Sequence, residues 1–447
     1  MRKLLFTFIV ILGGVFLPCE IAIAYHLPPY MKFGFDRVVD PFGNIFIVSG
    51  KCYSERKCRY TTAKYNRSGE QLWIREGQGM GQLHNYFAAI GVDAQSNAYI
   101  VQRIPNRKSV RKRRGKRRVV EIRADCLITK YDGNGQEIWT TSFGEGKEDA
   151  IDPTGLAVGR NGEVFVTGTC VRAAGDSHMD TYTDDMFEDD DDIRTKKYDR
   201  DGKLSWSVRY NEAMGNEDWP FHIFLDDKGN VYIAGTSHEG NQRGSHLVTI
   251  KYDASGTLLW ARSYTPMKES FSGAEYVVVD DCGDVYVLGS SMNRDQIQSE
   301  LITIKYDLKG ERQWVASYSD NDKKFAGPAM ITRDDEGDIY VSGYISHSHW
   351  QAPSALAHSN TTGEIVVIKY NTAGKKEWVA KYEKPQSAKG WIIDVIVDDK
   401  LNNYLMAQIE SEVVIVKHDS DGKQQWTRRF GNLVDFLKIF SELYHRE

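Results

Sequence analysis

A tyrosine followed eight residues later by a tryptophan recurs along the whole chain and constrains the fold more than any other feature. In "KYDASGTLLW" the two residues are Tyr252 and Trp260. The repeated tryptophans are Trp73, Trp139, Trp206, Trp260, Trp314, Trp378 and Trp426. A tyrosine stands eight residues before each of them except the last, where His418 takes its place. Seven copies of one pattern predict a repeat array rather than a set of unrelated domains.

A second module of the type "GNVYIAG" alternates strictly with the first. Its aromatic residues are Phe46, Tyr99, Phe165, Tyr232, Tyr286, Tyr340 and Tyr404. Each full unit contains four short runs rich in Val, Ile, Tyr and Trp, separated by Asp, Gly and Asn turns, which is typical of four β-strands. A closed ring buries both faces of every such sheet, whereas a linear stack exposes two. We therefore predict an all-β, seven-bladed β-propeller of four-stranded antiparallel blades over residues 25–430.

The two ends of the repeat region predict how the ring closes. The chain enters on an inner strand, "FDRVVD", and leaves on an outer one, "QQWTRRF". This phasing offers no exchange of strands between the first and last blades. In the tail, residues 431–447, the apolar residues Leu433, Phe436, Leu437, Phe440 and Leu443 recur at helical spacing. We expect a short amphipathic helix packed on the propeller near the join.

The first 24 residues have the pattern of a signal peptide. Arg2 and Lys3 precede an apolar run over residues 4–17, and "AIA" at 22–24 offers a cleavage site. The run is short for a membrane span, which needs about 20 residues. We expect export with cleavage after Ala24 to the periplasm, the cell surface or the medium, and a retained anchor is the alternative.

Export to an oxidising compartment makes the cysteines candidates for disulfides. Cys52 and Cys58 lie close together in "KCYSERKC" and are the predicted pair. Pairing of Cys126 with Cys170 stays open, and Cys282 is the candidate for the remaining thiol.

The unit "VVVDDCGDVYVLGSSMNRDQIQSELITIKYDLKGERQW" resembles the SBBP repeat, a β-propeller repeat of exported and surface proteins of bacteria. The resemblance covers about residues 33–430 and implies a propeller and export. Its Asp-x-x-Gly-x-x-x-Trp part is also similar to the tryptophan-docking motif of pyrroloquinoline-quinone propellers, but those usually have eight copies and a different second strand. The repeat family implies no shared catalytic residues.

Variation in length is confined to one class of loop. The repeat tyrosine and the next aromatic of the second module are 34 residues apart in all six cases, whereas the return distance varies from 14 to 33. The variable segment joins the second and third strands of a unit, and it is long in residues 103–125, 170–194 and 344–364. By alternation of strand direction these three loops share one rim with the connections between blades. Variable loops on a rigid scaffold commonly carry binding function.

Two of the long loops are strongly charged. "RKSVRKRRGKRR" holds nine basic residues between 107 and 118, and nine acidic residues lie between 176 and 192. The candidate polyanion-binding residues are Arg111, Lys112, Arg113, Arg114, Lys116, Arg117 and Arg118. Neutralisation of one loop by the other, a polyanionic partner and a proteolytic site at the basic run are the alternatives. Without interleaved aromatic residues the basic run does not favour nucleic acid.

The acidic stretch 184–192 is a candidate for Ca²⁺ binding through carboxylates, and no other cofactor or metal site is predicted.

A third set of candidates lies where inner strands begin. Tyr86, Trp219 and Trp391 each stand seven residues before the aspartate that ends their strand. With the nearby His84, Asp218 and Asp394 they form a candidate site for a sugar or peptide at the channel mouth. Ordinary packing at a strand start is the alternative.

Residues that recur in every unit are expected to be structural. A lysine precedes the repeat tyrosine in six copies, as Lys251 precedes Tyr252, and precedes His418 in the seventh. An aspartate such as Asp226 ends the first strand in six copies. We expect ion pairs between these lysines and aspartates.

No catalytic motif such as G-x-S-x-G or H-E-x-x-H is present in the sequence. The sequence therefore favours an exported binding or interaction module for a protein, a glycan or another polyanionic surface. The alternatives are a propeller hydrolase or lyase acting on a glycan or peptide at the channel mouth, and a purely architectural surface protein.

Overall fold

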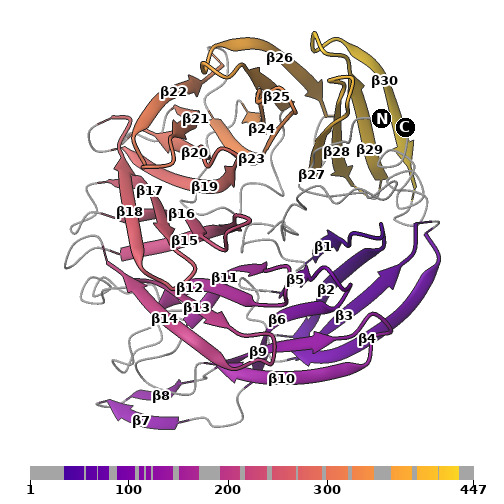
Figure 1. Ribbon diagram of the computed structural model, residues 1–447, viewed down its shortest axis with the longest axis vertical. Coiled ribbons are helices and arrows are strands. Elements are labelled where there is room, and N and C mark those ends of the chain that lie inside the picture. The colour runs from indigo at the N-terminus through magenta and orange to yellow at the C-terminus, as the bar shows by residue number, and fades with distance from the viewer. Residues whose placement is uncertain are drawn as a thin grey trace.

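A computed structural model shows seven four-stranded antiparallel sheets arranged around a common centre, as Figure 1 shows. The prediction of a seven-bladed β-propeller is confirmed. The structure describes residues 35–54, 57–67, 69–79, 88–105, 110–114, 117–121, 124–143, 151–170, 192–211, 217–238, 244–267, 270–293, 298–320, 325–346, 364–384, 390–410 and 412–431. The predicted signal segment and C-terminal helix lie outside these ranges. Within them, no helix is long and apolar enough to cross a bilayer.

Each blade runs from an inner strand to an outer strand in chain order. Blades 1 to 3 consist of β1 (Phe35–Val39), β2 (Ile45–Ser54), β3 (Lys57–Tyr65), β4 (Gln71–Gly79); β5 (Ala88–Val92), β6 (Ala98–Pro105), β9 (Ala124–Tyr131), β10 (Glu137–Phe143); and β11 (Ile151–Val158), β12 (Val164–Cys170), β13 (Asp192–Tyr198), β14 (Leu204–Tyr210). Blades 4 and 5 consist of β15 (Glu217–Leu225), β16 (Val231–His238), β17 (Ser245–Tyr252), β18 (Leu258–Tyr264); and β19 (Phe271–Val279), β20 (Val285–Met292), β21 (Ser299–Tyr306), β22 (Arg312–Tyr318). Blades 6 and 7 consist of β23 (Phe325–Arg333), β24 (Ile339–Ser346), β25 (Glu364–Tyr370), β26 (Lys376–Glu383); and β27 (Gly390–Val397), β28 (Asn403–Ile409), β29 (Glu412–His418), β30 (Gln424–Phe430). A separate hairpin, β7 (Val110–Arg114) and β8 (Arg117–Glu121), is inserted between β6 and β9.

In blades 1 to 6, the repeated tryptophan joins the outer strand to the next blade through a hydrogen bond. Trp260 of β18 donates a hydrogen bond from Nε1 to the Leu308 carbonyl, 3.2 Å away in the β21–β22 turn. Gly310 of the same turn has φ +77°, and a Cβ there would lie 2.7 Å from the indole of Trp260. The same bond joins Trp73 to Gly133, Trp139 to Arg200, Trp206 to Ala254, Trp314 to Thr372 and Trp378 to Ser420. These indoles therefore lie between adjacent blades.

The second-strand aromatic packs against the tryptophan of its own blade. Tyr232 and Trp260 meet edge to face with ring centroids 6.4 Å apart, and all seven blades have the corresponding pair. Edge-to-face contacts of this kind add about 0.5–1.5 kcal/mol beyond the area that they bury. The repeated tryptophan therefore contacts an aromatic ring of its own blade in all seven blades, and in blades 1 to 6 it also donates a hydrogen bond to the next blade.

The strand-end aspartate builds the first turn of a blade. Asp226 Oδ1 accepts hydrogen bonds from the backbone N–H groups of Lys228 and Asn230, at 2.9 and 2.8 Å. Asp226 Oδ2 accepts the Tyr232 hydroxyl at 3.0 Å. Four other blades repeat the bond to the tyrosine, at Asp93, Asp280, Asp334 and Asp398.

The recurrent lysine differs in part from the sequence prediction. The expected ion pair with the strand-end aspartate is present in blade 1, where Lys64 Nζ lies 3.9 Å from Asp40. In blades 5 and 6 the lysine instead pairs with an aspartate at the end of the turn, Lys305 with Asp284 and Lys369 with Asp338 at 2.8 Å. All seven lysines lie over the second-strand aromatic, 4.8–5.6 Å from the ring centroid. The turn N–H groups and the tyrosine hydroxyl already occupy the strand-end carboxylate, so the lysine meets the ring face instead.

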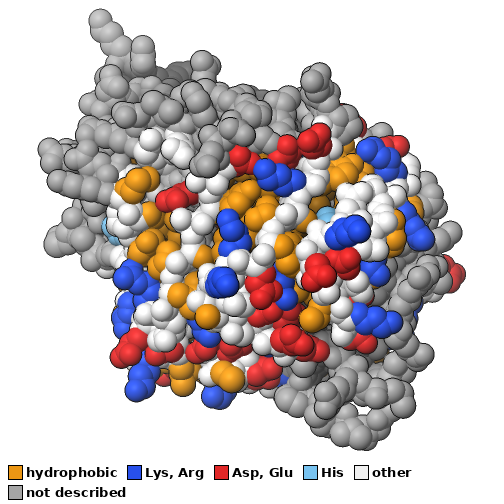
Figure 2. Space-filling model, turned by 90° about the horizontal axis from the view of Figure 1, so that it is seen from above, with side chains coloured by type: hydrophobic (Ala, Val, Ile, Leu, Met, Phe, Trp, Pro, Cys, Tyr) orange, Lys and Arg blue, Asp and Glu red, His pale blue; other side chains and the backbone are white. Residues whose placement is uncertain are grey.

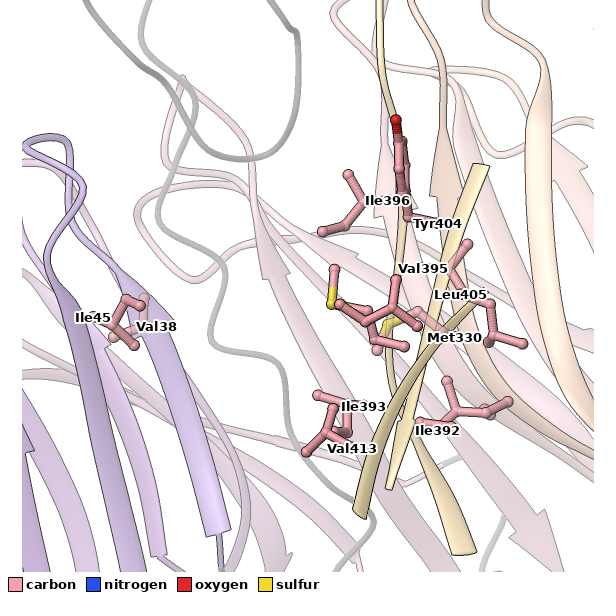
Figure 3. Close-up of a cluster of buried hydrophobic side chains, with 14 of the residues drawn as sticks. Val38, Ile45, Met330, Ile392, Ile393, Val395, Ile396, Tyr404, Leu405 and Val413 are labelled. Carbon is pink, nitrogen blue, oxygen red and sulfur yellow. The ribbon is translucent and has the colours of Figure 1, made fainter. Parts of the chain in front are cut away.

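Among the described strands, blades 7 and 1 exchange none where the ring closes, in agreement with the sequence prediction. One apolar cluster extends from blades 6 and 7 into blades 1 and 2. Figure 3 shows its members Val38 and Ile45 on the side of blade 1, with Ile393 and Val395 on the side of blade 7.

A buried ion pair accompanies this apolar contact. Arg37 Nη2 lies 2.6 Å from Asp394 Oδ2 and donates a second bond, 3.1 Å long, to the Ile393 carbonyl.

Candidate functional site

The strands that flank the three long loops all end at one rim of the propeller. Antiparallel pairing within each blade puts the β6–β9, β12–β13 and β24–β25 connections at the same end as the links between blades. Residues 171–191 and 347–363 lie outside the described residues, and so does most of the candidate Ca²⁺ stretch. Asp192, its last residue, is fully buried at the start of β13, and its carboxylate contacts Arg209 Nε. Among the described residues no group of three His, Cys, Asp or Glu is arranged to hold a metal ion.

The basic run forms a hairpin of its own. The register sets Arg113 opposite Arg118 and Arg114 opposite Arg117. Nearer the base of the hairpin, Arg111 stands opposite Val120 and Lys112 opposite Val119. Lys116 falls outside the described residues. The hairpin forms no sheet with any blade, and Figure 1 shows it beyond the outer strands of the ring.

Trp219 is the candidate aromatic whose side chain the structure describes. It lies in β15 and is partly exposed. Its ring centroid is 4.7 Å from that of His238, which belongs to the next strand, β16. Burial, with a smaller contribution from the neighbouring His246, lowers the pKa of His238 to about 4. The pair is therefore uncharged at neutral pH and presents a flat, largely apolar face with a polar nitrogen, which suits stacking on a sugar ring.

The other members of that candidate set are less exposed or not described. Tyr86 and His84 lie outside the described residues. Trp391 belongs to β27, where its backbone pairs with Gln408. Asp218 is fully buried. Its register partner is Ser237 on β16, whose own partner on β17 is His246.

Asp394 belongs to the join between blades rather than to an open rim. Its side chain is 3% exposed and is paired with Arg37. A second carboxyl, Asp36, accepts hydrogen bonds from the backbone N–H groups of Ile90 in blade 2 and of Arg37. Burial raises the pKa of Asp36 to about 8, against the opposing effect of these bonds and of the Arg37 charge.

Sequence reasoning missed the charged group at the join. A signal was present, because Asp36 and Asp394 occupy equivalent positions in their units, four residues before the strand-end aspartate. The other units have uncharged residues or a histidine there: Ala89, Gly155, His222, Tyr276 and Met330.

The structure places the backbone of all four cysteines named in the disulfide predictions. Cys52 and Cys58 stand directly opposite each other in the β2–β3 register. Directly opposed residues have Cβ atoms about 4.5–5.5 Å apart, and a disulfide needs about 3.5–4.5 Å, so the bridge stays a prediction. Cys282 is exposed in a turn of blade 5 and is not bridged. Cys126 Sγ lies 3.8 Å from the Ile151 carbonyl, and Ile151 is the register partner of Cys170.

No family model matches the chain, and no curated protein matches it. Solved structures resemble it at low identity. A protein from Lactobacillus plantarum is 13% identical with a TM-score of 0.39, over 68% of this chain and 77% of that one. A GH93 α-L-arabinofuranosidase of Fusarium graminearum is 10% identical with a TM-score of 0.39, over 62% and 79%. A cobalt-substituted apocarotenoid oxygenase of Synechocystis is 13% identical with a TM-score of 0.38, over 67% and 71%. These likenesses bear on neither ligand nor reaction.

Proposed function

We propose that this protein is an exported propeller of the SBBP-repeat type that acts as a binding module. Its ligand site is the rim formed by loops 103–125, 170–194 and 344–364 together with the channel mouth beside Trp219. The signal-like segment 1–24 supports export to the periplasm, the cell surface or the medium.

The contrast between the two rims carries this proposal. One rim carries the turns between the first and second strands and between the third and fourth strands, and we call it the turn rim. There the recurrent residues join neighbouring blades: the indole of Trp260 and the ammonium of Lys251 both lie within hydrogen-bond distance of the Leu308 carbonyl. On the loop rim, by contrast, one blade carries a basic hairpin, another an acidic segment and a third the partly exposed Trp219–His238 pair. A rigid ring with one uniform rim and one varied rim is the arrangement expected of a binding scaffold.

The test is a binding screen of residues 25–447 against neutral glycans, anionic glycans and peptides. Trp219→Ala should weaken binding of a stacked ligand about fivefold to 150-fold, because stacking on an aromatic ring contributes about 1–3 kcal/mol. Phe42→Ala is the matched control, since Phe42 is 56% exposed in a turn on the opposite rim. Absence of any saturable ligand would refute the binding role, and turnover of a bound glycan or peptide would favour the hydrolase or lyase alternative.

A further inference from the structure

The β7–β8 hairpin concentrates like charge in a way that protein folding disfavours. Its two rows nearest the turn pair arginine with arginine, Arg113 with Arg118 and Arg114 with Arg117. Like charges directly opposite each other destabilise an antiparallel pair. An isolated two-stranded hairpin is marginal in water even without such repulsion. Neutralisation of the tip by an anion would therefore stabilise a hairpin with this sequence.

The register also shows how the charge is distributed. Because successive residues of a strand face opposite sides, the two arginine rows lie on opposite faces of the hairpin. Lys112 adds to one face and Arg111 to the other. The tip is therefore basic on both sides, whereas the valines Val110, Val119 and Val120 and the single acidic residue Glu121 lie toward its base.

The blades have a different surface. Figure 2 shows Lys and Arg interspersed with Asp, Glu and apolar side chains over the described part of the ring on the face seen from above. On that face, positive charge is not segregated as it is along β7 and β8. The hairpin is thus a local basic element on a molecule of net charge −5.

We infer that the β7–β8 hairpin binds a linear anionic polysaccharide through its arginine tip, an inference that rests on the proposed binding function of this rim. Arginine forms paired hydrogen bonds with carboxylate and sulfate groups. A flexible chain reaches both faces of the hairpin, whereas a flat bilayer meets one face at a time. The tip has no apolar residue to enter a bilayer and no aromatic residue to stack on a nucleic-acid base.

The experiment measures binding of heparin and polygalacturonate to the wild-type protein at several salt concentrations. The test variant replaces Arg113, Arg114, Arg117 and Arg118 by Gln. Each exposed ion pair contributes up to about 1 kcal/mol, so the four together predict affinity lowered roughly a hundredfold and a shallower salt dependence. The matched control changes net charge equally on the opposite rim, by Gln at the exposed turn lysines Lys203, Lys309, Lys375 and Lys423. Its affinity should stay within about threefold of wild type.

A second variant separates charge from hairpin stability. Arg117→Glu with Arg118→Glu places one carboxylate opposite Arg114 and another opposite Arg113. The hairpin then gains two cross-strand pairs of opposite charge and loses its anion site. We expect polysaccharide binding to be lost although hydrogen exchange in β7 and β8 slows. Retained binding in either hairpin variant overturns the inference.

The arms also separate this inference from the proposed function. If the wild-type protein binds neutral glycans and the four Arg→Gln replacements leave that affinity unchanged, the binding function stands and the hairpin inference is overturned. Binding of phosphatidylglycerol vesicles or single-stranded DNA without binding of either polysaccharide overturns it in favour of those partners. Absence of every ligand refutes both.

Discussion

The join between blades 7 and 1 predicts a specific cost for one substitution. Arg37→Val removes the 2.6 Å ion pair with Asp394, whose carboxylate is 3% exposed. Breaking a buried ion pair from one side costs about 3–5 kcal/mol of unfolding free energy. Asp36 adds little to this cost at pH 7, because its pKa of about 8 keeps it mostly protonated. We expect Arg37→Val to lose about 3 kcal/mol.

The double variant tests whether charge or packing closes the ring. Arg37→Val with Asp394→Met reproduces the combination of Met330 and Val395 at the equivalent positions of blades 6 and 7. Replacing both ions by apolar residues of suitable size is often neutral or stabilising. The double variant should therefore recover to within about 1 kcal/mol of wild type.

Urea unfolding followed by tryptophan fluorescence measures both variants. The control is Arg160→Met, which removes an exposed pair with Asp227 at 2.7 Å and should cost less than about 1 kcal/mol. A cost for Arg37→Val no larger than the control, or a double variant as unstable as the single one, refutes the role of the ion pair in closing the ring.

Three further predictions follow from the described contacts. Gly310→Ala should destabilise by about 2 kcal/mol or more, because its Cβ would meet the Trp260 indole at 2.7 Å and its φ is +77°; Gly431→Ala, with nothing within 4 Å, should be close to neutral in the same unfolding assay. Because the pKa of Asp36 is raised to about 8 in the folded protein, the Asp36 carboxyl loses its proton at lower pH in the unfolded state than in the folded state. The contribution of protonated Asp36 to stability is therefore complete below about pH 4 and is lost as pH rises to about 8. Asp36→Asn should flatten this part of the stability–pH curve, and an unchanged curve would contradict the assignment. His238 should titrate near pH 4 by NMR, so its contribution to stability is lost as pH falls from about 6.5 to 4, and a midpoint near 6.5 would show that it is solvated.

Much of the fold was predictable because its determinants are periodic. The contact between the second-strand aromatic and the repeated tryptophan, as between Tyr232 and Trp260, occurs in all seven blades, so the sequence carries both residues seven times. The candidate site was less predictable. Trp219 could be placed at a strand start by counting from Asp226, but its stacking on His238 depends on the register between two strands.

The inner-strand bulges show a similar limit. In five blades a β-bulge precedes the residue that stands four positions before the strand-end aspartate or its equivalent, as at Pro220/His222 in β15 and Ile392/Asp394 in β27. Proline stands at three of these bulges, at Pro153, Pro220 and Pro328. Proline within a strand is a usable signal of a bulge, whereas β27, where an isoleucine stands instead, has none.

The sequence alone determined the number of blades, the order of strands and the rim on which length varies, because each of these follows from local spacing and strand alternation. Only the tertiary structure decided which residues meet across blades. The contact of Arg37 with Asp394 joins residues from opposite ends of the chain, so the spacing within one unit does not predict that these two side chains pair. The lysine such as Lys251 meets an aromatic ring rather than the strand-end carboxylate, because the turn N–H groups and the tyrosine hydroxyl of the folded blade reach that carboxylate first.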